Sequence, residues 1–240
     1  MTVDAEFLNQ VGDATWPPAE FRSVGPWTLR RGLGGGKRVS SATTDRAVTE
    51  AEIDQAIAGM AAMDQPPLFM LRPGQEAMDQ QLAERGFQVI DPVVIYTIPV
   101  ADLCDIPIPR VTVISIWEPL AIMREIWAAG GIGPARLAVM DRVTGSKIAL
   151  LGRFEEKPSG VAFVAIHEGA AMLHALEVVP HQRRKGVGVW FMRAAAIWAR
   201  DNGAQTLSLM CTRANTGANA LYTSLGMQPV GEYHYRHLPT

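Results

Sequence analysis

A strand, a basic glycine-rich loop and a helix follow one another between residues 173 and 200. Residues 173–179 are mostly apolar and partly β-branched, and Pro180 ends this strand because it has no N–H to donate to a ladder. Three cationic residues and two glycines come next. Apolar residues then recur at helical spacing, which predicts a helix that begins near Gly188. This order is typical of an α/β fold.

The start of such a helix is suited to binding an anion. Its first turn has unpaired N–H groups and a partial positive charge, and Gly186 and Gly188 have no β-carbon to hinder a phosphate. The alternative is a simple turn with a solvated basic face. The six-residue spacing of Arg183, Gly186 and Gly188 arises by chance in about one chain of this length in four. Residues 212–227 form a second segment that follows the loop in the sequence. Together the two segments favour the anion site, because they match two motifs of one protein family, described next.

Residues 171–231 resemble the GNAT superfamily of acyl-CoA-dependent N-acyltransferases. The family loop Arg/Gln-x-x-Gly-x-Gly/Ala is matched by Arg183, Gly186 and Gly188. A later helix signature of the family is matched by Asn215, Ala218, Leu221, Tyr222 and Gly226, with Met227 where Phe is commoner. The resemblance implies an α/β (α+β) fold with a mixed, mostly antiparallel, splayed sheet flanked by helices.

The resemblance also implies that acetyl-CoA is the cosubstrate and that its diphosphate binds to the loop. The residues expected to contact it lie at the end of the strand, in the loop and in the later helix. They are Val178, Val179, Arg183, Arg184, Lys185, Gly186, Val187, Gly188, Val189, Asn215, Ala218 and Tyr222.

Acyl transfer requires a base for the amine, a hydrogen-bond donor for the oxyanion and a proton for the leaving thiolate. The resemblance assigns the oxyanion to backbone N–H groups near Val178 and Val179, and the thiolate to Tyr222. A phenol with a pKa of about 10 is protonated at neutral pH and can donate.

Glu177 is the expected base, or else a group that attracts a cationic acceptor. In a regularly alternating strand it lies opposite Leu176 and Val178, and it faces the cleft if those two pack on the core. The same alternation places His174 on the Leu176 side, where a buried structural histidine is expected.

The first hundred residues resemble a degenerate copy of the same fold. A strand at 68–71, a helix at 76–85 closed by Gly86, and one or two strands at 88–100 repeat the order seen at 206–235. No Arg/Gln-x-x-Gly-x-Gly loop lies between a strand and a helix there, so no coenzyme is expected. We place the boundary in the proline-containing segment 101–110 and expect domains at 1–104 and 105–240.

Three further patterns concern local structure. Thr49 is a predicted helix N-cap. The glycine run 32–36 is not a phosphate loop, since arginines occupy the places of its first Gly and its Ser/Thr, and we expect a hairpin turn between strands at 27–31 and 39–43. A meander is predicted at 147–154, 160–167 and 171–179.

Composition narrows the classes of partner. A net charge of −2 gives no basic footprint for nucleic acid. The acidic start and the short apolar runs predict a soluble, cytoplasmic protein without a membrane anchor. Cys104 and Cys211 are expected to be reduced, with Cys211 a poor nucleophile, and the spacing of the histidines predicts no metal site.

The sequence thus predicts an acetyl-CoA-dependent N-acetyltransferase that acts on a primary amine by direct attack in a ternary complex. The alternative is a catalytically silent acyl-CoA-binding sensor or interaction module, which the degenerate first half favours. A homodimer is compatible with either. Small amines, amino acids, antibiotics, peptide N-termini and protein lysines all stay open as acceptors.

Overall fold

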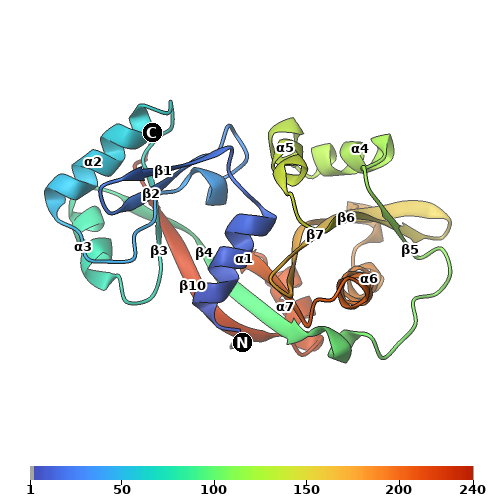
Figure 1. The fold of residues 1–240 in the computed structure, drawn as a ribbon. Helices are drawn as coiled ribbons and strands as arrows, with labels where there is room; N and C mark the ends of the chain where they lie inside the picture. The colour runs from blue at the N-terminus through green and yellow to red at the C-terminus, as the bar shows by residue number, and fades with distance from the viewer. Residues whose placement is uncertain (1–2, 240) are drawn as a thin grey trace. The chain divides into compact units, whose positions relative to one another are not determined.

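The structure is a computed structural model that describes residues 3–239, and it divides into two compact units (Figure 1). Unit 1 comprises residues 3–17, 95–211 and 215–230, and unit 2 comprises residues 18–94, 212–214 and 231–239. The chain therefore passes between the units several times. The expected domains, 1–104 and 105–240, do not coincide with these units, and the division into a degenerate and a catalytic domain stays a prediction.

Unit 1 is built on a mixed sheet with strand order β10-β4-β9-β8-β7-β6-β5. Its elements in chain order are α1 (Ala5–Thr15), the end of β4 (Gln88–Pro99), β5 (Val113–Ile116), α4 (Ala121–Ala129), α5 (Pro134–Arg142), β6 (Lys147–Phe154), β7 (Lys157–His167), β8 (Ala170–Val178), α6 (Val187–Asp201), β9 (Thr206–Thr212), α7 (Thr216–Ser224) and the start of β10 (Gln228–His237).

The predicted meander is confirmed, since β6, β7 and β8 pair in antiparallel fashion in that order. Helix α5 was not predicted, although Pro134 occupies its first turn, where a proline without an N–H is tolerated. The mostly antiparallel sheet flanked by helices matches the expected fold class.

The sheet of unit 1 splays between β8 and β9. These two strands pair in parallel only from Ala170 to Leu173, opposite Thr206 to Leu209. On its other side β8 stays paired with β7 as far as Val178. The second half of β8 therefore leaves its neighbour, and a pocket opens at that place.

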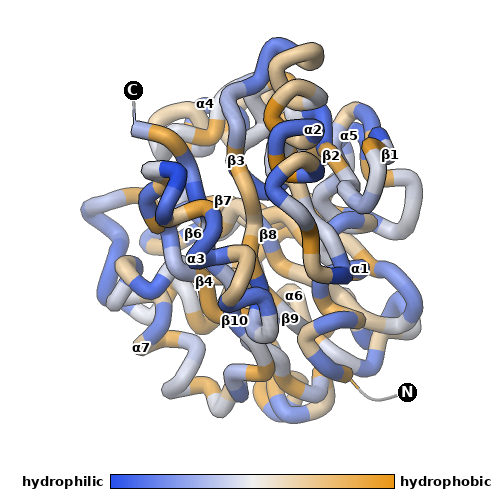
Figure 2. The backbone as a smooth tube through the Cα atoms, turned by 90° about the vertical axis from the view of Figure 1, so that its left-hand side faces the viewer, coloured by the Kyte–Doolittle hydropathy of each residue, from blue (hydrophilic) through white to orange (hydrophobic). Residues whose placement is uncertain are grey.

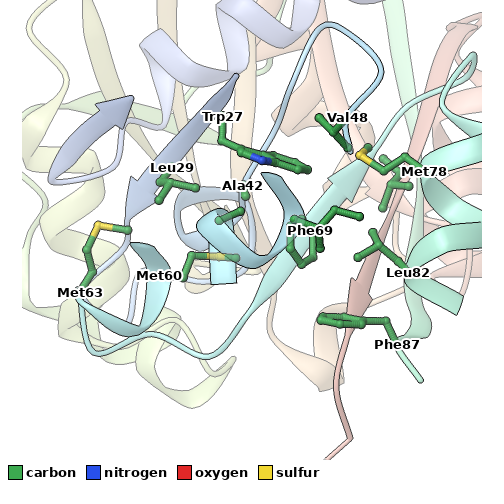
Figure 3. Packing of buried hydrophobic residues seen from close by; sticks show 13 residues of the cluster. Trp27, Leu29, Ala42, Val48, Met60, Met63, Phe69, Met78, Leu82 and Phe87 are labelled. Carbon is green, nitrogen blue, oxygen red and sulfur yellow. The ribbon is translucent and has the colours of Figure 1, made fainter. Parts of the chain in front are cut away.

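Unit 2 contains β1 (Glu20–Val24), β2 (Trp27–Arg31), α2 (Glu50–Ala61), β3 (Leu68–Leu71), α3 (Glu76–Glu84) and the remaining parts of β4 and β10. Strand β3 is hydrophobic throughout (Figure 2) and pairs with β10 in antiparallel register, with His237 opposite Leu68. Trp27, Met60, Phe69, Leu82 and Phe87 belong to the core (Figure 3).

Local predictions for unit 2 have mixed outcomes. The helix start at Thr49 is confirmed as a capping box with Glu52, and the left-handed Gly86 after α3 is also confirmed. The predicted hairpin of β2 with a strand at residues 39–43 is wrong, although Thr43 forms one isolated antiparallel bridge to Thr28. Strand β2 pairs with β1, whereas residues 38–40 form a 3₁₀ turn.

No helix within residues 3–239 is long and apolar enough to span a membrane. The same residues contain no group of three or more His, Cys, Asp or Glu side chains that could hold a metal.

Candidate active site

A pocket of about 460 Å³ lies where β8 leaves β9. Its walls come from the end of β8, the loop before α6, the first turn of α6 and one face of α7. The lining residues are Leu176, Glu177, Val178, Gln182, Arg183, Arg184, Gly186, Val187, Gly188, Val189, Asn215, Gly217, Ala218, Leu221 and Tyr222. All of them belong to unit 1.

The loop before α6 presents a row of backbone amides. Pro180–Gln182 form a 3₁₀ turn, and Arg184 and Gly186 then adopt positive φ angles of 60° and 79°. Among residues 3–239, no acceptor receives a hydrogen bond from the amides of residues 184–188, whereas the Val189 amide donates to the Gly186 carbonyl at 3.0 Å. Successive amides in such a loop at a helix N-terminus form an anion-binding nest.

Gly188 allows α6 and α7 to approach closely. A β-carbon at this position would lie 2.7 Å from Cδ2 of Leu221. Lys185, by contrast, does not line the pocket. Its ammonium lies 5.3 Å from the ring centre of Phe154 and donates to the Gln182 side chain at 3.3 Å. The Lys185 side chain therefore does not support the predicted contact with the donor, and only its backbone amide, in the row at residues 184–188, is left for that contact.

A bulge at Ala175 changes the direction of the side chains along β8. Phe163 pairs with His174 and Val161 with Glu177, so two steps on β7 correspond to three on β8. Ala175 has a φ of 51°, and its carbonyl accepts a 2.8 Å hydrogen bond from the buried indole of Trp127. Paired residues share a face, so His174 and Glu177 lie on the same face of the sheet.

The alternation predicted for His174 and Glu177 is therefore wrong, because regular alternation would place them on opposite faces. His174 is nonetheless buried. Its Nε2 lies 2.8 Å from the Thr15 hydroxyl, which donates to the Val11 carbonyl and so accepts from the imidazole. The Trp16 ring lies 5.0 Å from the imidazole, centre to centre.

Glu177 lies on the pocket wall between a cation and a glycine. Arg183 Nη2 donates to its carboxylate at 2.9 Å, and Arg183 Nε donates to the Val178 carbonyl at 2.9 Å. Gly130, which follows α4, packs so closely that a β-carbon there would lie 2.6 Å from Cδ of Glu177. The pocket-facing position agrees with the prediction for Glu177, whereas its arginine partner was not foreseen.

The amides of Val178 and Val179 have different surroundings. Val179 donates to the Ser159 carbonyl at 3.0 Å and is absent from the pocket wall. Successive amides of a strand point to opposite edges, so the Val178 amide points toward the open edge of β8. The prediction that Val179 contributes an oxyanion donor is therefore wrong, since its N–H is used within the sheet.

Tyr222 lies on the α7 side of the pocket, and Asn215 caps that helix by accepting from the Ala218 amide at 3.2 Å. Tyr222 is 5% exposed, and burial, with smaller contributions from Cys211 and Tyr96, raises the pKa of its phenol well above the usual range. The phenol is therefore protonated at neutral pH. Burial also raises the pKa of the Cys211 thiol to about 11, which leaves it a poor nucleophile.

The structure brings together all the predicted donor contacts except Val179 and Lys185. Leu176, Gln182, Gly217 and Leu221 also line the pocket and were not predicted. Gly217 and Leu221 lie within a recognised helix signature, and their spacing from Asn215 and Tyr222 could have revealed them. Gln182 and Leu176 become visible only once the turn and the bulge are known.

Comparisons with known proteins agree with this fold. The acetyltransferase (GNAT) family model matches residues 134–227, which include the whole pocket wall. The uncharacterized N-acetyltransferase YobR of Bacillus subtilis (strain 168) is 24% identical over 97% of this chain and 98% of its own length.

Solved structures of low identity support the fold alone. A GCN5-related N-acetyltransferase from Kribbella flavida superposes with a TM-score of 0.71 and 20% identity, covering 100% of this chain and 97% of its own. A tandem GNAT protein from the clavulanic acid biosynthesis pathway has a TM-score of 0.62 and 14% identity, with coverages of 95% and 86%. Residues 134–227 therefore match the acetyltransferase (GNAT) family, and the pocket lies within that matching segment.

Proposed function

We propose that the protein transfers an acetyl group from acetyl-CoA to a primary amine by direct attack in a ternary complex. The observation that carries this proposal is the row of unpaired amides at residues 184–188, in a pocket that also contains Tyr222 and Glu177. Such amides suit a diphosphate, and the neighbouring Arg183 and Arg184 add positive charge.

Bound acetyl-CoA supplies a thioester. In our proposal Glu177 receives a proton from the amine, directly or through one water, as the new C–N bond forms. The Val178 amide donates a hydrogen bond to the carbonyl oxygen as negative charge develops there. Tyr222 gives a proton to the sulfur as the C–S bond breaks.

Turnover can be tested by measuring free thiol release from acetyl-CoA with a panel of amines. Tyr222→Phe should lower kcat about 10²- to 10⁴-fold and leave the Kd for coenzyme A unchanged. Tyr96→Phe is the matched control, because Tyr96 packs 5.8 Å from the Tyr222 ring but lies outside the pocket. The control should keep kcat within about threefold. Tight acetyl-CoA binding without turnover on any amine would instead support a silent acyl-CoA-binding module.

A further inference from the structure

The guanidinium of Arg183 lies close to two places where an anion can bind it. Its guanidinium pairs with the Glu177 carboxylate and the Val178 carbonyl. It also lines the pocket and directly precedes the row of unpaired amides. A diphosphate bound by those amides would be a second anion for the same guanidinium.

The ion pair between Arg183 and Glu177 is weak enough for another anion to replace Glu177 as the partner of Arg183. The Arg183 side chain is 56% exposed, and ion pairs of this kind are individually weak. Glu177 is 20% exposed and packs against Gly130 at the C-terminal end of α4, where the helix carries partial negative charge. A carboxylate in that position favours a cation, and within the free protein Arg183 is that cation.

We infer that the diphosphate of the donor and the Glu177 carboxylate compete for Arg183, so that donor binding releases Glu177 to receive the amine. This inference rests on the proposed function and adds an order of binding to it. The amine of the acceptor takes the place of Arg183 beside Glu177, so the donor should bind first and increase affinity for the acceptor. By linkage, the acceptor increases affinity for the donor to the same extent.

The competition predicts that affinity for coenzyme A increases when the Glu177 carboxylate is removed or is moved away from Arg183 by a shorter side chain. Coenzyme A is the probe, and its Kd is measured by titration calorimetry on the full chain. Glu177→Gln should bind coenzyme A about two- to fivefold more tightly than wild type, the size expected for losing an exposed ion pair. Glu177→Asp keeps the charge but shortens the side chain, and it should also bind more tightly.

Arg183→Gln provides the matched background, because glutamine is the other residue that the loop pattern allows. In that background Glu177→Gln should change the Kd by less than about 1.5-fold. Equal tightening in both backgrounds would show a general charge effect and overturn the competition, as would unchanged affinity of both Glu177 variants. Thermal unfolding of each variant verifies the fold. Failure of wild type to bind coenzyme A at all would overturn the proposed function itself.

Discussion

Gly130→Ala tests the position of Glu177 without substituting any residue that we assign to the reaction. The added β-carbon would lie 2.6 Å from both Cγ and Cδ of Glu177 and 2.8 Å from Oε2. Carbon atoms in ordinary contact are about 3.5 to 4.0 Å apart, so the carboxylate must move by about 1 Å. A misplacement of that size lowers turnover by about 10²-fold, equivalent to about 2.7 kcal/mol of activation free energy.

The fold should tolerate this change. Gly130 is exposed and has φ and ψ angles of −85° and 8°, which alanine adopts without strain. We expect the free energy of unfolding in urea to change by less than about 0.5 kcal/mol. The kinetic assay is thiol release with the best amine of the panel.

Gly133→Ala is the control, because a β-carbon there meets no atom within 4 Å and the residue has an ordinary φ of −86°. It should retain kcat/KM within about threefold. A wild-type kcat/KM for Gly130→Ala, in a correctly folded protein, would refute the assignment of Glu177 as the proton acceptor.

Three further predictions concern stability and reactivity. Arg236, and less strongly His234, lower the pKa of Asp79 from 3.8 to about 2, so the stability that this carboxylate supplies is complete above pH 4 and is lost toward pH 2. Between pH 4 and pH 2 the free energy of unfolding in urea should fall by about 1 kcal/mol more for wild type than for Asp79→Asn. Equal decreases would contradict a stabilising Asp79–Arg236 pair. Iodoacetamide near neutral pH should modify Cys104 and leave Cys211 unmodified, as measured by peptide mass mapping. An adduct on Cys211 would contradict this prediction. Ala175→Gly should raise the free energy of unfolding by about 1 kcal/mol, because glycine adopts a positive φ without the steric strain that alanine has there. A decrease would contradict the positive φ at this bulge.

The part of the site that binds the donor can be predicted from the sequence because it is local. The residue types of the loop and the N-cap of α7 lie in short continuous segments, and their conformations follow from nearby glycines and from Asn215. Nearly all the predicted contacts therefore line one pocket.

The surroundings of Glu177 cannot be predicted in the same way. The bulge at Ala175 contains neither glycine nor proline, and the Trp127 indole that bonds its carbonyl comes from a distant helix. Similarly, the Arg183–Glu177 pair depends on how the loop folds back over β8. Pairing of β3 with β10 joins residues 68–71 to residues 234–237, which are far apart in the sequence, and no local pattern specifies it.

That pairing has a consequence for how the protein is made. Residues 68–71 leave the ribosome long before residues 234–237, which complete their sheet. Domains of many proteins fold in order as they are synthesised, but the pairing of β3 must wait until β10 has been made. Until residues 234–237 have been synthesised, the hydrophobic strand β3 lacks its hydrogen-bonded neighbour, and a truncation before residue 231 would leave that edge of β3 exposed for pairing with other chains.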